Sequence, residues 1–526
     1  MVLASMAVGA GCQPSQPVKQ GEAQLARPAA KTAAKAEDMP KHLEMPDGED
    51  VLAKTLEMNS AKYAPPPTEW RKGHVTKAKL APSAIKRSKG RFEVRLPSGA
   101  PIATPTVYRN KVMVSGGFRS KQFYALKVET GEPVWGLQLD DDGPSTAACA
   151  ERICVWNTES CTIFAVEADT GKMLWSWWLG DPLMSAPTID GGRVFTAYPA
   201  RAAAPRGTSK APKAPPPGAS HALVALDLKT GSLLWQRWID SDVMSAPVAV
   251  KGALYVASQA GTLYKFDQVT GKVLAAKARR ATSAPVIDAS GVYYTRRLDD
   301  PDDQDTVEEG VVSERPEGDD SDSGTYMGGG GYVTHKKAAP YLSPKVQKKS
   351  SYGKQSFADD AANGFGSGAP AAANASKAAY NIGQSSVSSL QAFQGSRILR
   401  FGALSVSSMG DEVVGLDAAT GKKNWSFKLK GDAKAAGGFL AAPPAAAGNR
   451  IFIGTLAGKI QTVEPKSGAR KKAYDAKHPI RSQPVIHQGW IYVGTTDGWL
   501  VAIDTGNDSL TGWSTWGKDA ARTGRL

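Results

Sequence analysis

The chain has 526 residues and 55.5 kDa, enough for about three domains or one large repeat architecture, and its 54 Gly and 34 Pro favour turns over long helices. Thirteen Trp and thirteen Phe need a core, which excludes collagen-like and wholly disordered chains, and no apolar run approaches the roughly 18 residues of a membrane-spanning helix. The net charge of +14 is spread along the chain without a basic helix, a zinc-finger spacing or an aromatic RNA-binding signature, so we do not expect nucleic acid as a partner.

The first twelve residues resemble the signal of a bacterial lipoprotein, in which a short apolar run ends at a cysteine. Residues 1–11 read MVLASMAVGAG, and Cys12 precedes the polar stretch Gln-Pro-Ser-Gln-Pro. This segment departs from the usual lipoprotein signal in two places. No Lys or Arg precedes the apolar run, and Gly9 stands where Leu or Val is usual. An Ala-rich start with a chance cysteine is the alternative. The resemblance implies that Cys12 carries a diacylglycerol and anchors the protein in the cell envelope, with the periplasmic side of the outer membrane as the favoured location.

Residues 13–90 are rich in Ala, Lys, Pro and Gln, contain Pro65-Pro66-Pro67 and show little apolar periodicity. This composition predicts a mostly disordered tether. One short helix is expected around Glu49 to Lys62.

From about residue 91 an eleven-residue pattern recurs, in which an apolar strand leads into a Thr-Gly turn and a Trp follows the Gly by four residues. The clearest copies are ALKVETGEPVW (125–135), AVEADTGKMLW (165–175), ALDLKTGSLLW (225–235) and GLDAATGKKNW (415–425), with weaker copies at 265–275, 462–472 and 502–510. Glycine supplies the positive φ of such a turn, so we assign this role to Gly131, Gly171, Gly231, Gly271 and Gly421. The expected docking residues, large rings that pack on a neighbouring sheet, are Trp135, Trp175, Trp235 and Trp425.

A second pattern precedes the copies, with an apolar strand, a turn and an alternating strand, as in SAPVAVKGALYVAS (245–258). The two patterns together give four short antiparallel strands in about 40 residues, which indicates one blade of a β-propeller. First strands occur near Thr104, Ser145, Ala186, Ala246, Ala284, Pro443 and Pro484, and SLQAFQGSRILRFG (389–402) adds an eighth. The predicted fold is an all-β, single eight-bladed propeller over residues 91–526, with seven blades as the alternative. RFEVRL (91–96) is expected to close the ring as the outer strand of the last blade.

The eleven-residue pattern resembles the tryptophan-docking repeat of the PQQ-like, or quinoprotein-type, β-propeller family. The resemblance covers about residues 91–298 and 388–526. Lys127 and Glu167 depart from it at the Asp position, and Ala275 and Lys472 depart from it at the Trp position.

Three further cysteines, Cys149, Cys154 and Cys161, lie within thirteen residues of one another. In an exported protein one pair is expected to bridge neighbouring strands and leave the third free, and buried thiols are the alternative. None of the six His lies near them in sequence, so a metal site is not expected.

The segment at about 299–388 is an insertion in the propeller. It begins with the acidic run DDPDDQDTVEEG and continues into a stretch rich in Gly, Lys, Ser and Ala. The calcium-binding spacing D-x-D-x-D-G is absent, so a solvated loop is favoured over a metal site. EEGVVSERPEG (308–318) is the part expected to complete the fifth blade, and most of 299–383 is expected to be mobile.

Quinoprotein dehydrogenases share the repeat and hold pyrroloquinoline quinone (PQQ) over Ca²⁺, next to a disulfide between adjacent cysteines. This chain has no adjacent cysteine pair, so no cofactor is expected, and a PQQ-dependent dehydrogenase is an alternative rather than the favoured function. A lipid-anchored propeller of this repeat resembles the BamB family of outer-membrane assembly lipoproteins. The resemblance implies a non-enzymatic scaffold that binds envelope proteins through its loops, as a monomer within a complex. A cell-wall-associated structural protein is the third candidate.

Overall fold

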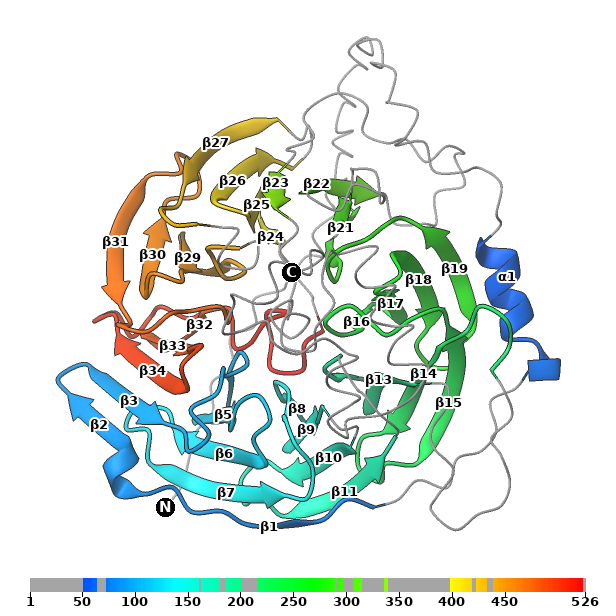
Figure 1. Cartoon of the computed structure of the whole chain (residues 1–526), viewed down its shortest axis with the longest axis horizontal. Helices are drawn as coiled ribbons and strands as arrows, with labels where there is room; N and C mark the ends of the chain where they lie inside the picture. Colours follow the sequence, from blue (N-terminus) through cyan, green and yellow to red (C-terminus); the bar gives the residue numbers. More distant parts are fainter. Residues whose placement is uncertain are drawn as a thin grey trace, which may run out of the picture.

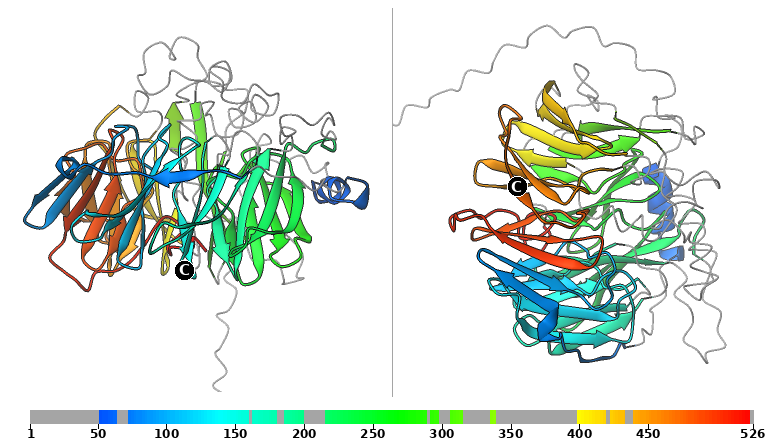
Figure 2. Two further views of the ribbon diagram at one scale, coloured as in Figure 1. Left: turned by 90° about the horizontal axis from the view of Figure 1, so that it is seen from below. Right: turned by 60° about the vertical axis from the view of Figure 1, so that its left-hand side comes forward.

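The computed structural model of the protein describes residues 51–63, 72–159, 162–179, 185–199, 215–288, 291–297, 306–314, 335–338, 398–418, 422–432 and 439–523. Its strands form antiparallel sheets around a common centre (Figure 1). The ring of sheets is flattened like a disc, as the edge-on view shows (Figure 2). The fold class predicted from the repeats, an all-β propeller with four-stranded antiparallel blades, is confirmed.

The described strands belong to eight sheets. From the centre outward, four of them are β4 (Thr106–Tyr108), β5 (Lys111–Ser115), β6 (Gln122–Lys127), β7 (Pro133–Leu139) and β1 (Val75–Lys77); β8 (Ala148–Ala150), β9 (Ile153–Asn157), β10 (Thr162–Glu167) and β11 (Met173–Trp178); β12 (Thr188–Asp190), β13 (Arg193–Pro199), β14 (His221–Asp227) and β15 (Leu233–Ile239); and β16 (Val248–Val250), β17 (Ala253–Ala257), β18 (Thr262–Asp267) and β19 (Val273–Ala278).

The other four are β20 (Val286–Asp288), β21 (Gly291–Arg297), β22 (Thr306–Glu314) and β23 (His335–Ala338); β24 (Ile398–Phe401), β25 (Leu404–Met409), β26 (Glu412–Asp417) and β27 (Lys423–Lys428); β28 (Ala445–Ala447), β29 (Arg450–Gly454), β30 (Lys459–Val463) and β31 (Arg470–Asp475); and β32 (Val485–His487), β33 (Trp490–Gly494), β34 (Trp499–Asp504), β3 (Arg91–Arg95) and β2 (Ile85–Ser88). In the sheet of β20–β23 the side chains of β22 and β23 lie outside the description, so this sheet is defined by its backbone pairing.

Among the described turns, tight hairpins join the first two strands of the sheets. Between β4 and β5 the turn residues Arg109 and Asn110 have φ values of 48° and 59°. Between β8 and β9 Glu151 and Arg152 have φ values of 48° and 67°. Two successive positive φ angles match the twist of antiparallel strands, which explains why a two-residue loop suffices here.

The innermost strands follow one another around the centre from β4 to β32, and β32 in turn contacts β4. The last sheet combines distant parts of the chain, because β3 pairs with β34 from Arg91↔Ile503 to Arg95↔Trp499. Apolar side chains of successive sheets pack in shared clusters, such as the one in which Phe92 and Val94 meet Leu126 and Tyr492.

The eighth first strand, expected within residues 389–402, lies at the end of that segment, and the residues before Ile398 lie outside the description. The innermost strand β24 is ILRF, and Gly402, with a φ of 57°, makes the turn to β25. The second strand, LSVSSM, alternates small polar and apolar residues and has no aromatic residue, which hides it from a pattern based on rings. The predicted completion of the fifth blade by part of 308–318 corresponds to β22. Most of 299–383 lies outside the described residues.

Parts of the segment that was predicted to be a mostly disordered tether form helices and strands, within residues 51–63 and 72–90. The expected short helix is present as α1 (Val51–Met58), followed by η2 (Ala61–Tyr63). β1 pairs with β7, and β2, which follows η3 (Pro82–Ala84), pairs with β3. These segments gain order from the propeller edges on which they lie, so their own weak periodicity did not reveal them.

Candidate functional site

The four docking tryptophans lie between neighbouring sheets. Each ring is at most 9% exposed, and each indole N–H donates to a backbone carbonyl of the next sheet. The bonds are Trp135 to Ala168 (3.0 Å), Trp175 to Leu228 (2.9 Å), Trp235 to Gln268 (3.0 Å) and Trp425 to Pro465 (2.8 Å). Because each acceptor lies three residues before a turn glycine, the repeat joins one blade to the next as well as folding each blade.

The turn glycines lie under these rings. Gly171 has a φ of 71°, and a Cβ on it would be 2.8 Å from the ring of Trp135. Gly231 stands in the same relation to Trp175, and Gly271 to Trp235. At Gly131 the ring is Phe92, and Gly421 lies outside the described residues. The turn therefore requires glycine for two reasons: its φ is positive, and a side chain would collide with the neighbouring ring.

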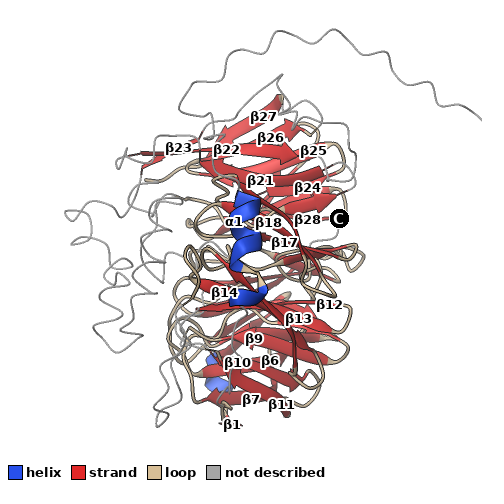
Figure 3. Ribbon diagram, turned by 90° about the vertical axis from the view of Figure 1, so that its right-hand side faces the viewer, coloured by secondary structure: helices blue, strands red, loops and turns tan. Residues whose placement is uncertain are grey.

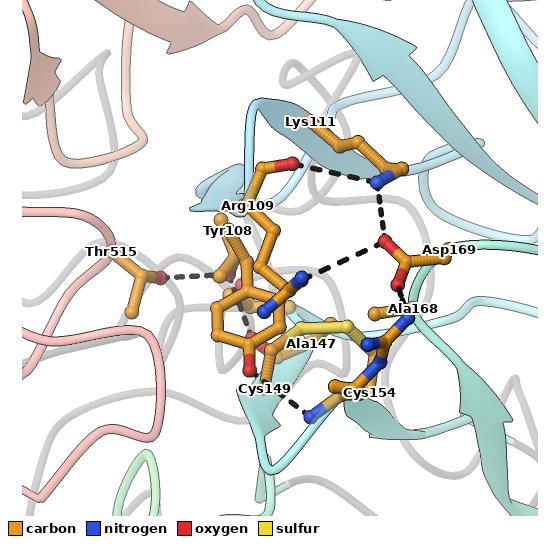
Figure 4. The surroundings of a disulfide bond; sticks show 12 residues. Tyr108, Arg109, Lys111, Ala147, Cys149, Cys154, Ala168, Asp169 and Thr515 are labelled. Carbon is orange, nitrogen blue, oxygen red and sulfur yellow. Dashed lines mark hydrogen bonds and ion pairs between the residues drawn. A yellow bond between two sulfur atoms is a disulfide. The ribbon is translucent and has the colours of Figure 1, made fainter.

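A disulfide joins Cys149 and Cys154, which are register partners on β8 and β9. Both cysteines are buried. Figure 4 shows the polar cluster beside them, in which the Asp169 carboxylate of the next turn meets Lys111 at 2.7 Å and Arg152 at 2.7 Å. These ion pairs hold the hairpins of neighbouring sheets together. Cys161 and Cys12 lie outside the described residues.

The C-terminal segment 512–523 crosses the centre of the propeller (Figure 1). It bonds to the innermost strands of successive sheets. Gly512 bridges Ala447 of β28, Ile486 of β32 donates to Trp513, Val107 of β4 donates to Ser514, Cys149 of β8 donates to Ala520, and Ile189 of β12 donates to Ala521. Five blades are thus bound by one segment of chain.

Arg522 is the most deeply placed charge of this segment, with 0% of its surface exposed. Its guanidinium donates to the carbonyl oxygen of Pro187 at 2.8 Å and to that of Thr146, and it lies 5.3 Å from the ring centroid of Trp516. Burial lowers the pKa of the Arg522 guanidinium from 12.5 to about 9, so this group remains a cation at neutral pH. Its contacts are structural, because they join two inter-blade loops to the chain terminus.

The N-terminal segment 51–90, here called the belt, covers the outer edges of several blades. α1 packs on β15 and β19, where Figure 3 shows it on the outer side of the ring. The side-chain amide of Asn59 then bonds both the N–H and the carbonyl of Trp238 on β15. Farther along the belt, Ser176 of β11 donates to the carbonyl of Gly73. β1 and β2 finally add fifth strands to β7 and β3.

The outer strands β27 and β31, here called the open edges, differ from the covered ones. Among the described residues, no strand of the belt pairs with either of them. Figure 1 shows both on the rim of neighbouring sheets. Residues 422–430 and 470–475 together carry seven Lys and Arg and one acidic residue, Asp475, whereas β7 and β11 carry no charge. All residues of β31 except Tyr474 are exposed.

Among the described residues, no cluster of three His, Cys, Asp or Glu is placed to hold a metal ion. No helix in that part of the chain is long and apolar enough to span a membrane. The buried tyrosines and carboxylates within the described ranges serve the sheets and loops around them, as Asp141 does in accepting bonds from Thr158 and Thr162.

Sheets joined by tryptophans that dock on the glycine turn of the next sheet define a propeller with PQQ-like repeats. A family model described as outer membrane protein assembly factor BamB matches residues 123–204, 217–297 and 379–521, and the chain belongs to this family. No curated protein matches the chain in sequence.

Three solved structures illustrate the range of similar proteins. BamB from Moraxella catarrhalis has 14% identity and a TM-score of 0.47, and the match covers 82% of this chain and 98% of that one. A quinohemoprotein alcohol dehydrogenase from Pseudomonas putida has 11% identity and a TM-score of 0.46, with 88% and 82% covered. Sqt1 from Saccharomyces cerevisiae has 10% identity and a TM-score of 0.47, with 79% and 97% covered.

Sequence reasoning missed the central segment and the belt. The signal for the first was present in residues 512–523, whose two Trp and one Arg follow the last repeat without a strand pattern. The belt left almost no signal, since Asn59 and Gly73 each bond one residue on a strand more than 100 residues away.

Proposed function

We propose that this propeller has eight blades and is a non-enzymatic, lipid-anchored scaffold of the cell envelope that binds other proteins during outer-membrane protein assembly. The observation that carries the proposal is membership of the BamB family over more than half of the chain. The family description names an outer membrane protein assembly factor, and we extend that role to this chain.

The arrangement of the ring supports a binding role. The centre of a propeller is a common place for a ligand, and here it is crossed by the chain's own segment 512–523 with Trp516 and Arg522 buried. The rim instead presents exposed strands. Its charge differs from one side of the ring to another, because the covered edges of β7 and β11 carry no charge whereas the open edges are basic. A rigid disc with a varied rim is suited to hold a partner in a defined orientation.

We further propose that Cys12 carries the lipid anchor and that the protein works without PQQ or Ca²⁺. Replacing Cys12→Ser is expected to move the protein from the membrane fraction to the soluble fraction, because several acyl chains anchor firmly whereas none remains in the variant. Sedimentation of the Ser variant with membranes would contradict this anchor. For the cofactor, a bound quinone absorbance after addition of PQQ and Ca²⁺ would favour the dehydrogenase alternative.

The scaffold is tested by site-specific photo-crosslinking in cells that make the full chain. A crosslinker at Lys471 on the open edge, and a matched one at exposed Lys229 on the β14–β15 turn, are compared after solubilisation of the envelope. We expect an outer-membrane assembly protein as the crosslinked partner at one position and not at the other. Peptidoglycan fragments as the only adduct, or no envelope protein at either position, would refute the proposed function.

A further inference from the structure

The belt shows how the rim of this propeller accepts an added strand. On the first blade β1 pairs with β7, and the N–H of Ala78, just past β1, donates to the outward carbonyl of Gly136 at 2.9 Å. Gly136 lies five residues after the turn glycine Gly131. On β15 the outward N–H and carbonyl of Trp238 form hydrogen bonds with the side-chain amide of Asn59 instead of with a strand. Covered edges thus have their outward backbone groups bonded at defined positions of the repeat.

The same position on β31 is Ala473, five residues after the turn glycine Gly468. The N–H of Ala476 donates to the carbonyl of Gly458 just before β30, so in the alternating pattern of an antiparallel pair the backbone groups of Tyr474 face β30 and those of Ala473 and Asp475 face outward. The Asp475 carbonyl accepts from the guanidinium of Arg91. Within the described chain, the outward groups of Ala473 have no strand beside them.

The side chains of β31 indicate which strand would fit. The Arg470 guanidinium lies 5.4 Å from the ring centroid of Phe427, and the Lys472 ammonium lies 4.5 Å from that of Tyr474. Lys471 has an ion pair with Glu464, whereas Arg470 and Lys472 have none among the described residues. Lys and Arg on an edge oppose pairing with a second copy of the same edge, and they attract an edge of opposite charge.

We infer that β31 binds an extended acidic polypeptide segment as a fifth strand, with its backbone paired at Ala473 and its carboxylates beside Arg470 and Lys472. The inference rests on the proposed function, since it names the kind of partner segment that the scaffold binds. Backbone bonds supply the affinity of such an added strand, and the side chains supply its selectivity.

The test uses the purified full chain and a fluorescein-labelled seven-residue peptide that alternates Glu and Thr. We expect saturable binding, loss of binding when Lys replaces Glu in the peptide, and slower amide exchange at Ala473 on addition of the peptide. Reversal of both charges, Arg470→Glu with Lys472→Glu, is expected to weaken binding by about tenfold. The matched control, Lys423→Glu with Lys428→Glu on β27, changes the net charge equally and is expected to leave binding unchanged.

Two further reagents separate strand pairing from simple charge attraction. Ala473→Pro removes the outward N–H while leaving the pairing of Tyr474 with β30, and a peptide with N-methylated backbone leaves the protein unaltered. Both are expected to abolish binding. If the N-methylated peptide binds as tightly as the unmodified one, the inference is overturned in favour of a general polyanion surface. The same conclusion follows if dextran sulfate binds and is weakened by the Arg470→Glu, Lys472→Glu charge reversal to the same extent as the acidic peptide. Peptide binding is measured without any envelope component, so its failure leaves the crosslinking result for the scaffold intact.

Discussion

The hydroxyl of Tyr492 donates a hydrogen bond to the carbonyl oxygen of Val128 over 2.8 Å, and this bond joins the last sheet to the first. At the other described junctions with a docking Trp, the indole N–H bonds the carbonyl three residues before the turn glycine. Val128 likewise lies three residues before the turn glycine Gly131. The ring that contacts Gly131 is that of Phe92 on β3, where the other turns have an indole ring. Two residues from opposite ends of the chain thus reproduce the contact that one Trp makes elsewhere.

Replacing Tyr492→Phe should lower the free energy of unfolding by about 1–3 kcal/mol, because the buried Val128 carbonyl loses its donor while the ring is retained. Burial also raises the pKa of the Tyr492 hydroxyl, so it remains a donor up to alkaline pH. Urea unfolding monitored by circular dichroism measures the loss. Tyr474→Phe on the exposed strand β31 is the control and should have little effect. Equal losses in the two variants would show that the hydroxyl of Tyr492 contributes nothing at this junction.

Replacing Trp175→Ala should destabilise the protein by about 3–5 kcal/mol, since the ring is 7% exposed and its indole bonds Leu228. The neighbouring Leu174→Ala removes a side chain that is 37% exposed and should change the free energy of unfolding by no more than about 0.5 kcal/mol. Thermal and urea unfolding of both variants give the comparison. A Trp175→Ala protein as stable as the Leu174→Ala protein would rule out a docking role for this ring.

The sequence revealed those parts of the fold that depend on neighbours in the chain. Turn glycines such as Gly231 and rings such as Trp235 recur because each blade meets the same local demands, so spacing alone was enough to predict a propeller of four-stranded blades. The central segment and the belt depend on contacts between distant residues. Arg522 bonds loops more than 300 residues away, and nothing near it in sequence indicates those carbonyls. The open edges β27 and β31 also needed the structure, because Lys-rich segments are common and these two are distinguished only by the cover on other edges.

The turn aspartates Asp227 and Asp267 should give the protein a component of acid sensitivity. The Thr230 hydroxyl holds the pKa of Asp227 below its usual range, and the Thr270 backbone N–H does the same for Asp267. A carboxyl with a lowered folded-state pKa stabilises the fold above its ordinary pKa of about 3.9, and this stability is lost as the pH falls through the lowered value. Both residues are half-buried with their carboxyls near the surface, so solvent screening keeps the effect small.

The measurement is the urea midpoint between pH 6 and pH 2 for the wild type and for the Asp227→Asn, Asp267→Asn double variant. The wild type should lose stability below about pH 4 more steeply than the variant, whose amides do not titrate. Parallel curves would mean that the acid response comes from other carboxyls.

The C-terminal segment leads to the prediction with the widest structural effect. Arg522→Met preserves much of the side-chain volume but leaves the carbonyls of Thr146 and Pro187 without their donor, which should cost about 2–5 kcal/mol. Lys477→Met, at an ammonium that is 62% exposed, is the control and should be close to neutral. Hydrogen exchange distinguishes a local effect from a general one. If the segment holds the blades together, amides of Val107, Cys149 and Ile189, which donate to it, should exchange faster in Arg522→Met than in Lys477→Met. Unchanged exchange at these three amides would show that the segment occupies the centre without stabilising the innermost strands.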